Sequence, residues 1–463
     1  MECGREFDFN KSFFEQFAEL QKLVPRMSLN NINAENSEYV NYAGDNKNCY
    51  LLYTSDFNEN CCYGRWQMHC FKCFDCDFIN NSEFCYDSIE IIKCNQSIGS
   101  MLCKNSSNIY FSYNLSNCHN CFGCSNLNNK EFYVFNKKVS KEDFDEFLKN
   151  ADLGFYSSYQ KTKIYCYQEI AKTPHKALNI LNCENSLGDY LKNSKNAYLC
   201  FDSINVEDCK YSTNIQDNVK NCYDWDFVGF KSELCCEVVS SAYNLFDCQF
   251  IMNSWMGNAN VEYSELCLGN ENLFGCTGLR KKKNCILNKQ YLKEEFLNLK
   301  EKIIKHMIKN GEYGQFFPPY LSPFAYNESV ANDYLPLSKE EALARGFTWK
   351  DEDENFGYKG PIVEIPDSIK NCDENIVDKI LICELTQKPY KMIKEEFKFL
   401  KENNLPIPRR SVHQRYKDRM SLKNSRNLWN RVCAKCGLQI FTTYAPEKPE
   451  VVYCEDCYLK EVF

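Results

Sequence analysis

The chain lacks any run of about eighteen consecutive apolar residues, so the sequence predicts no membrane-spanning helix. The first residues contain no apolar core typical of a secretory signal, and we therefore expect a cytoplasmic protein. The motifs GxxxxGK[ST], GxGxxG, HExxH and GxSxG are missing, which removes the usual sequence evidence for nucleotide binding, zinc proteolysis and serine hydrolysis. Only five histidines are present, without a recognisable acid–base pair, and we expect His175 and His306 on the surface.

The chain also lacks an excess of positive charge, because 63 Asp and Glu outnumber 55 Lys and Arg. The net charge of −8 gives no whole-chain reason to expect nucleic acid. Hydrophobic residues make up 44% and charged residues 25%, as in folded globular or repeat proteins. Cysteine, in contrast, occurs thirty times. In a reducing cytoplasm such residues are metal ligands, catalytic thiols or small buried hydrophobes. We expect most of them to be buried hydrophobes and four to be metal ligands.

Residues 36 to about 300 contain an internal duplication. Asn48-Cys49-Tyr50-Leu51 returns as Asn196-Ala197-Tyr198-Leu199, and Phe122-Gly123-Cys124 returns as Phe274-Gly275-Cys276. Further matches occur in the same order, with an offset that drifts slowly from 148 to 152 residues. Each half is expected to end in a helix, the first behind the N-cap candidate Ser140 and the second before Gly311.

A shorter cysteine rhythm lies inside each half. Spacings of nine join Cys76, Cys85, Cys94 and Cys103, and also Cys267, Cys276 and Cys285, whereas Cys209, Cys222, Cys235 and Cys248 are thirteen apart. Short strands separated by Asn, Asp, Ser and Gly at this spacing favour a β-solenoid, in which one chain position recurs above itself and asparagines stack at the corners. Two β-sandwich-like domains are the alternative. The expected fold is therefore mainly β with helical additions.

The remaining organisation divides the chain into five parts. We expect an amphipathic helix near Phe13–Val24 that docks on the next domain, and helices at 339–345 and 390–403. The predicted parts are an N-terminal helix and lead-in (1–35), two solenoid halves (36–155 and 156–312), a proline-marked linker (313–379), and a helical basic segment with a zinc ribbon (380–463).

The strongest chemical signal is a pair of Cys-x-x-Cys motifs near the C-terminal end. Cys433 and Cys436 are followed by Gly437, and Cys454 and Cys457 come after seventeen intervening residues. Two such knuckles can present four thiolates to one Zn²⁺ in tetrahedral geometry, and Gly437 suits a turn with positive φ. With four protein ligands the site would be structural, and the residues between the pairs predict strand, turn, strand. Two coincidental pairs or a dithiol redox site are the alternatives.

A weaker signal occurs twice earlier in the chain. His69 precedes a Cys-x-x-Cys-x-x-Cys run from Cys70 to Cys76, and a second run from Cys118 to Cys124 contains His119. Three thiols at this spacing form part of iron–sulfur patterns and could also begin a zinc site. No fourth cysteine follows at ferredoxin spacing, so we favour buried cysteines and keep metal binding as the alternative.

Residues 409–435 form a basic run. They contain nine Lys or Arg and one acid, Asp418, a local charge of +8. Such a run beside a zinc knuckle is typical of phosphate contact, and a solvated face or pairing with acids of the same chain is the alternative. The candidate phosphate-binding residues are Arg409, Arg410, Arg415, Arg419 and Arg426.

Several of these segments resemble an uncharacterised zinc-ribbon family of candidate-phyla bacteria. The resemblance covers essentially the whole chain. It rests on Phe7-Asp8-Phe9 with Phe13-Phe14-Glu15-Gln16-Phe17, on Asn36 to Leu51, and on the block from Leu405-Pro406-Ile407-Pro408 to Tyr458. Members are sometimes labelled CaiB/BaiF-type CoA-transferases, but no stretch here resembles that fold. Members usually carry a further Cys-pair ribbon before the segment that matches Gly4, whereas here Cys3 stands alone.

The sequence therefore favours a binding protein over an enzyme. We expect a zinc-dependent scaffold or adaptor whose ribbon and basic helix contact nucleic acid, either RNA or DNA, or an acidic protein. An enzyme with a carbohydrate- or acyl-transfer site on the solenoid surface is the alternative, since fold alone does not decide function. The sequence gives no catalytic residue, and the oligomeric state stays open.

Overall fold

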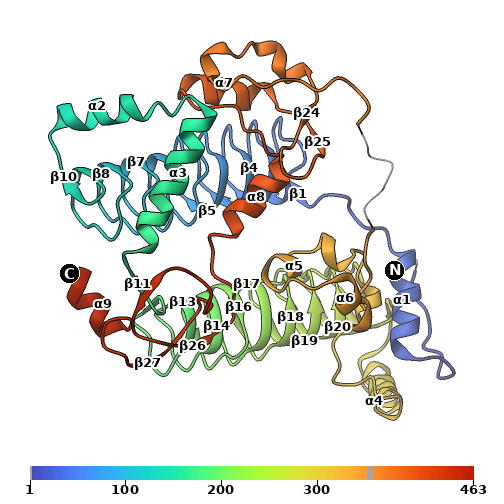
Figure 1. Ribbon diagram of the computed structural model, residues 1–463. Coiled ribbons are helices and arrows are strands. Elements are labelled where there is room, and N and C mark those ends of the chain that lie inside the picture. Colours follow the sequence, from blue (N-terminus) through green and yellow to red (C-terminus); the bar gives the residue numbers. More distant parts are fainter. Residues whose placement is uncertain (1–2, 352–357, 463) are drawn as a thin grey trace.

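The computed structural model describes residues 3–351 and 358–462. Residues 352–357, inside the predicted linker, and residues 1, 2 and 463 lie outside the described part. The architecture is mainly β with helical additions, as predicted, and two long stacks of parallel strands dominate it (Figure 1). We call the strands β1–β9 the first stack and the strands β12–β22 the second stack.

The first stack repeats its pairing every twelve residues. Tyr50 pairs with Cys62, and Cys62 pairs with Phe74, all in parallel. Isolated bridges at the same spacing join β5 to β6. The strands are β1 (Asn31–Ile32), β2 (Asn41–Gly44), β3 (Tyr50–Asp56), β4 (Cys62–Met68), β5 (Phe74–Asn80), β6 (Asn95–Ile98), β7 (Ser107–Tyr110), β8 (His119–Phe122) and β9 (Glu131–Val134), with β10 (Lys137–Lys138) antiparallel to β9.

The second stack has the same plan with some longer turns. Tyr223 pairs with Cys236 and Cys236 with Gln249, so each turn of chain here holds thirteen residues. The strands are β12 (Ile180–Leu181), β13 (Leu187–Lys192), β14 (Tyr198–Ile204), β15 (Val206–Glu207), β16 (Thr213–Lys220), β17 (Tyr223–Glu233), β18 (Cys236–Val239), β19 (Phe246–Met252), β20 (Ala259–Glu265), β21 (Glu271–Phe274) and β22 (Lys283–Ile286), with β23 (Lys289–Gln290) antiparallel to β22.

A three-residue unit sets the shape of each turn. Every third residue from Asn33 to Phe135 has a left-handed backbone, with φ between 45° and 60°. The residue that follows is buried in most of these units. Cys49, Leu52 and Cys61 are such inward residues and are at most 2% exposed. Asn and Asp tolerate the left-handed region better than other non-glycine residues, which explains their frequency at the corners.

The cysteine rhythms follow from these units. A spacing of nine is one twelve-residue turn less one unit of three, and the thiol of Cys73 accordingly donates to the carbonyl of Ser82, 3.3 Å away. A spacing of thirteen is one full turn of the middle of the second stack. Corner asparagines form the predicted ladders, since Asn48 donates to Asn60 at 3.3 Å. The prediction that most cysteines are buried is confirmed.

Helices cover the stack ends. The strand β10 leads into α2 (Lys141–Ala151), capped by Ser140 as predicted, and β23 leads into α4 (Lys293–Lys309). The helix α1 (Phe13–Leu23) packs on the C-terminal end of the second stack through Phe13, Phe17 and Tyr263, not on the stack that follows it in sequence, which corrects our expectation. Glu312 accepts hydrogen bonds from the first two N–H groups of α1, at 3.0 Å each.

Two other expectations differ from the structure. The residues predicted to open the second half form α3 (Tyr156–Ala171), a helix whose weak amphipathicity gave no periodic signal. His175 is 3% exposed rather than at the surface, because its ring lies between Tyr113 and Tyr444. No helix in residues 3–351 or 358–462 is both long enough and apolar enough to cross a membrane.

The remaining elements follow the second stack. They are the 3₁₀ turns η1 (Pro319–Leu321), η2 (Tyr326–Glu328), η3 (Ile369–Asn371) and η4 (Glu374–Asp378), and α5 (Ala331–Tyr334), α6 (Lys339–Ala344), β24 (Leu381–Ile382), β25 (Pro389–Tyr390), α7 (Lys394–Glu402), α8 (Val412–Met420), β26 (Trp429–Val432), β27 (Gln439–Thr442), β28 (Val451–Tyr453) and α9 (Glu455–Val462). The capping box predicted at Ser338 and Glu341 is present in α6.

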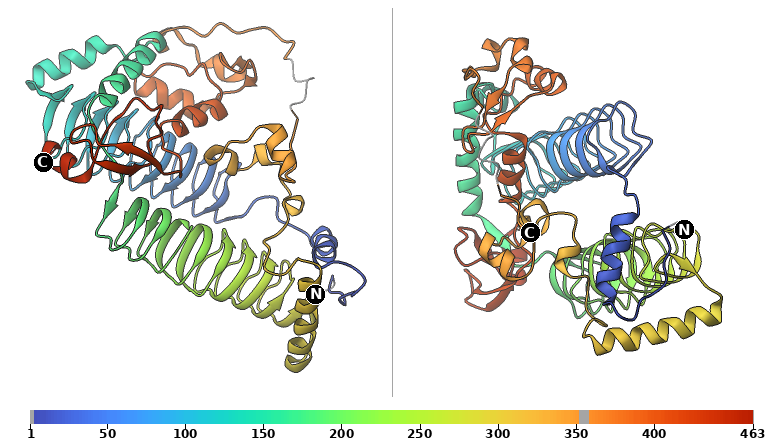
Figure 2. Two further views of the ribbon diagram at one scale, coloured as in Figure 1. Left: turned by 60° about the horizontal axis from the view of Figure 1, so that its bottom comes forward. Right: turned by 90° about the vertical axis from the view of Figure 1, so that its right-hand side faces the viewer.

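The two stacks lie side by side and run in opposite directions (Figure 2). Tyr42, near the start of the first stack, donates to Asn253, near the end of the second, at 2.7 Å. Trp66 and Phe227 also touch across the gap, with ring centroids 5.2 Å apart. The chain from α8 onward lies along both stacks, with α8 between them in Figure 1.

Candidate metal centre and the basic segment

The first knuckle is the turn between β26 and β27. The N–H of Cys433 donates to Leu438 at 2.8 Å, and the N–H of Gly437 donates to Cys433 at 2.9 Å. Gly437 has φ +75°, a left-handed conformation that glycine adopts without strain. A Cβ at Gly437 would meet nothing within 4 Å, so only the backbone requires glycine here.

The second knuckle is the start of α9. Cys454 directly precedes this helix and Cys457 lies in its first turn. The Sγ atoms of the four cysteines, Cys433, Cys436, Cys454 and Cys457, all lie within 4.8 Å of one another. The Sγ atoms of Cys436 and Cys454 are 3.8 Å apart. A tetrahedron with metal–sulfur bonds of about 2.3 Å has edges of about 3.8 Å, so the group can hold a metal ion.

Backbone groups favour the thiolate form of the first ligand. Burial raises the pKa of Cys433, but hydrogen bonds from the N–H groups of Cys436, Cys454 and Lys435 lower it to about 6. Thiolates are the form that binds metal. Because all four ligands come from the protein, the arrangement leaves no open position for water or substrate and suits a structural metal.

We call residues 429–462, which contain β26, β27, β28 and α9, the cysteine module. Its strands pair differently from the prediction. The sequence predicts that the strands on either side of the 445–449 turn form a unit of strand, turn, strand. Instead β27 pairs with β26, and β28 pairs in parallel with β11 (Pro174–Lys176), in the connection between the two stacks. The chain between the two stacks therefore contributes a strand to the cysteine module, and no local pattern in the sequence indicates this.

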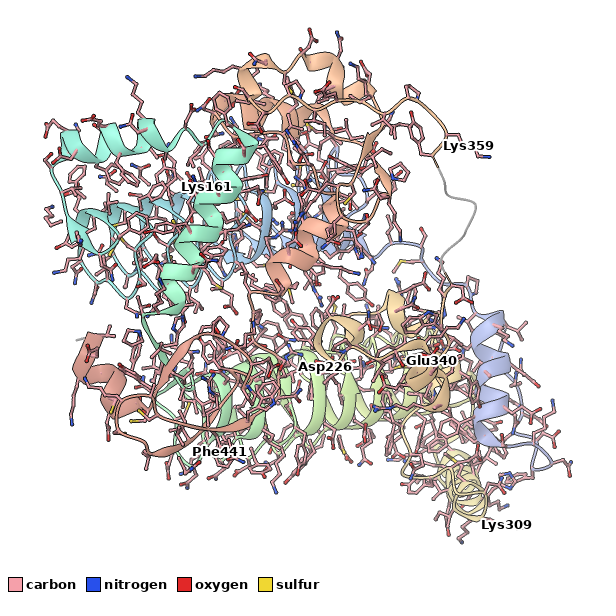
Figure 3. The ribbon with its side chains drawn as sticks, in the orientation of Figure 1. Lys161, Asp226, Lys309, Glu340, Lys359 and Phe441 are labelled. Carbon is pink, nitrogen blue, oxygen red and sulfur yellow. The ribbon has the colours of Figure 1, made fainter. Side chains whose placement is uncertain are left out.

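Side chains of the module also contact both stacks. Tyr458 accepts a hydrogen bond from Asn114 at 2.7 Å, and the hydroxyls of Tyr444 and Tyr113 lie 3.2 Å apart, which ties the module to the first stack. Thr443 donates to Asp189 of the second stack. Phe441 of β27 is 50% exposed and lies at the lower edge of the molecule in Figure 3.

The structure places two of the five candidate phosphate-binding arginines in the protein interior. Arg419 lies 2.7 Å from Asp77 and 3.0 Å from Asp75, and its side chain is 1% exposed. Arg415 lies 2.7 Å from Asp75 and 2.6 Å from Glu396 of α7. These guanidinium groups already have carboxylate partners and are closed to a phosphate in this arrangement, as the ion-pair alternative expects.

Lys423 and Arg426, the next two of these cations along the chain, contact an acid of the second stack. Lys423 lies 2.7 Å from Glu90 of the first stack and 3.1 Å from Asp202 of the second. Arg426 lies 3.1 Å from Asp202, with its guanidinium carbon 4.0 Å from the centroid of the Tyr334 ring. Burial raises the pKa of Asp202, but Lys423 and Arg426 outweigh it, so the pKa lies below its usual value. Asp202 therefore stays ionised between two cations.

The first two arginines of the run lie nearer the surface. Arg409 contacts Asp367 at 3.3 Å, and Arg410 contacts Glu384 at 2.9 Å and Asp418 at 2.8 Å. All five candidate arginines thus have acidic partners within the chain. Exposed His413 and Lys417 are also part of α8. Sequence reasoning missed the partner acids, although Asp75 and Asp77 flank Cys76 in a distinctive Asp-Cys-Asp run.

A search against protein-family models finds no match for this chain, and a search of curated proteins finds none either.

Proposed function

We propose that the protein is a non-enzymatic scaffold in which the C-terminal segment, residues 409–458, holds two β-solenoids in one fixed arrangement, with one structural Zn²⁺ in the ribbon. The observation that carries the proposal is the position of Lys423. Its ammonium group joins Glu90 of the first stack to Asp202 of the second, and it is 5% exposed. A segment kept free for an external partner would leave this charge exposed, because burying a charge is costly unless it is paired.

Zinc is the metal that the donor set favours. Four thiolates at tetrahedral distances suit Zn²⁺ or iron, and a closed site with two knuckles is typical of structural zinc. All thirty cysteines lie in the described residues and none of them forms a disulfide, which fits a reducing cytoplasm. The resemblance to the zinc-ribbon family is consistent with this proposal and adds no activity to it.

The turn-by-turn pairing supports the solenoid part of the proposal. Each unit contributes one inward residue, and successive turns place these residues in columns, as the thirteen-residue cysteine series does. A stack of this kind offers a long, rigid surface for a partner. An acidic protein or a nucleic acid would have to use the cations left exposed, Lys417 and Lys435 among them.

Limited proteolysis tests the scaffold proposal. Zinc-loaded protein is compared with protein treated with a chelator, and cleavage is mapped in residues 172–179 and 421–428. We expect metal removal to accelerate cleavage at both segments, because β28 would no longer hold β11 and the ribbon would no longer hold the chain that precedes β26. The matched control, Cys236→Ser, changes a half-buried cysteine outside the ribbon. Equal cleavage rates with and without metal would contradict the proposal.

A further inference from the structure

A second turn in the chain has the geometry of the first zinc knuckle. The strands β24 and β25 form a hairpin around Cys383. The N–H of Cys383 donates to Lys388 at 2.9 Å, and the N–H of Gln387 donates to Cys383 at 2.9 Å. These two bonds repeat those of Cys433 and Gly437, fifty residues later, and Gln387 has φ +56°, the same left-handed region.

The second helix after this hairpin, α8, corresponds to α9, and α7 is an addition between the hairpin and α8. Ser411 is the N-cap of α8, and its Oγ accepts from the N–H of Gln414 at 3.3 Å. Cys454 stands in the same place before α9, and its sulfur accepts from the N–H of Cys457. The offset between the two helix starts is 43 residues. Both helices contact the first stack, α8 through Arg419 and α9 through Tyr458.

The surroundings of the two leading thiols match group by group. The sulfur of Cys383 accepts from the N–H groups of Ser411, Thr386 and Leu385. The sulfur of Cys433 accepts from those of Cys454, Cys436 and Lys435, which are the corresponding residues. Burial raises the pKa of Cys383, but these bonds and the Thr386 hydroxyl lower it to about 7.

We infer that residues 381–420 form a second ribbon, built on the plan of the metal ribbon but without its set of four metal ligands. Cys383 stands at the first ligand position, and Thr386, Ser411 and Gln414 stand where the metal ribbon has Cys436, Cys454 and Cys457. In this ribbon hydrogen bonds to one buried thiol replace the metal. The helix α8 is therefore held against the first stack without metal, whereas α9 depends on it.

Restoring the ligands tests the inference. The variant Thr386→Cys/Ser411→Cys/Gln414→Cys should contain about one more zinc per chain than the wild-type protein when both are purified with zinc and measured by elemental analysis. The matched control is Leu385→Cys/His413→Cys/Lys417→Cys, which adds three thiols at exposed positions of the same segments. The control should gain no zinc. The gain is a difference between proteins, so it is independent of the content of the first ribbon.

A smaller change guards against a folding failure. The variant Thr386→Cys/Ser411→Cys supplies three thiolates and should bind Co²⁺ with intense thiolate-to-cobalt absorption beyond that of the wild type. Folded variants without additional metal would overturn the inference. Equal metal gain by the control variant would overturn it too, since binding would then need no particular positions.

Discussion

Arg419 and Asp77 form a fully buried ion pair, with Nε and Oδ2 2.7 Å apart and side chains that are 1% and 0% exposed. Asp75 contacts the same guanidinium at 3.0 Å. Burial raises the pKa of Asp77 above its usual value even though Arg419 counteracts it. The contact joins α8 to the strand β5, so a buried ion pair attaches the basic segment to the first stack.

Removing this arginine should destabilise the protein. Arg419→Met leaves Asp75 and Asp77 without their shared partner, and breaking a buried ion pair costs about 3–5 kcal/mol. We expect a loss of that size in the free energy of unfolding, measured with urea. Lys417→Ala, on the exposed face of α8, should change it by less than about 0.5 kcal/mol. Equal effects of both substitutions would contradict the assignment.

Substitution of Arg415 and Arg419 also distinguishes the scaffold proposal from a role in nucleic-acid binding. If Arg415 and Arg419 contacted phosphate, replacing both by alanine would reduce the slope of log affinity against log salt by about one or two units. We expect instead a lower thermal midpoint. Fluorescence anisotropy with labelled RNA and DNA between low and physiological salt measures the slope, and circular dichroism measures the midpoint. A reduced slope at unchanged stability would favour nucleic acid.

Metal content should depend on the ribbon cysteines alone. We expect about one zinc per chain, lost in Cys433→Ser/Cys454→Ser and retained in Cys76→Ser. Elemental analysis of the purified full chain measures this. Zinc that survives the double substitution, or iron with labile sulfide in the wild type, would show that a different cysteine group binds the metal.

The docking of the ribbon on the second stack should depend on pH through Asp189. Burial raises the pKa of Asp189 to about 6, although hydrogen bonds from Thr443 and from the backbone N–H groups of Asn179 and Tyr190 oppose the rise. Since the folded pKa exceeds the unfolded value near 3.9, the carboxyl contributes most to stability at low pH. That contribution is lost as the pH rises toward and past 6.

The variant Asp189→Asn cannot ionise and should lack this dependence. Between pH 4 and pH 7 the wild type should lose about 2 kcal/mol of unfolding free energy relative to the variant. Urea midpoints at each pH give the two curves, and effects of other groups cancel in their difference. Parallel curves would show that burial does not raise the pKa of Asp189, and would contradict the prediction.

Thiol reactivity should follow burial. Cys76, Cys222 and the other inward cysteines of the stacks donate to backbone carbonyls and are closed to solvent. In native protein we expect fast reaction at Cys3, Cys183 and Cys236, which are partly exposed, and slow reaction at the inward group until denaturant is added. Mass spectrometry after brief alkylation identifies the sites.

The local features of this protein could be predicted from the sequence because short sequence patterns determine them. Ser140, Ser338 and the paired cysteines of the ribbon each act within a few residues, and the structure has the helices and the sulfur cluster they predict. The cysteine spacings predicted a repeat, but the three-residue unit that produces these spacings was not predicted. Its signal is that almost every cysteine from Cys49 to Cys124 falls on the same third position.

Contacts between distant segments were out of reach. Asp75 and Arg419 are 344 residues apart in the sequence. The strands β11 and β28, which pair with each other, are also far apart in the sequence. Charge alone could not separate an arginine that binds phosphate from one that binds a carboxylate of its own chain, because the guanidinium suits both. The helix α3 carried too little periodicity to be recognised.

The central claim, that residues 409–458 fix the arrangement of the two stacks, is tested most directly by small-angle X-ray scattering. The wild-type protein with zinc is compared with Cys433→Ser/Cys454→Ser/Lys423→Ala/Arg426→Ala, which lacks both the metal and the bridge to Asp202. We predict a larger radius of gyration and maximum dimension for the variant, with an unchanged β signal in circular dichroism. Identical scattering from both proteins would contradict the claim, since the stacks would then hold their arrangement without this segment.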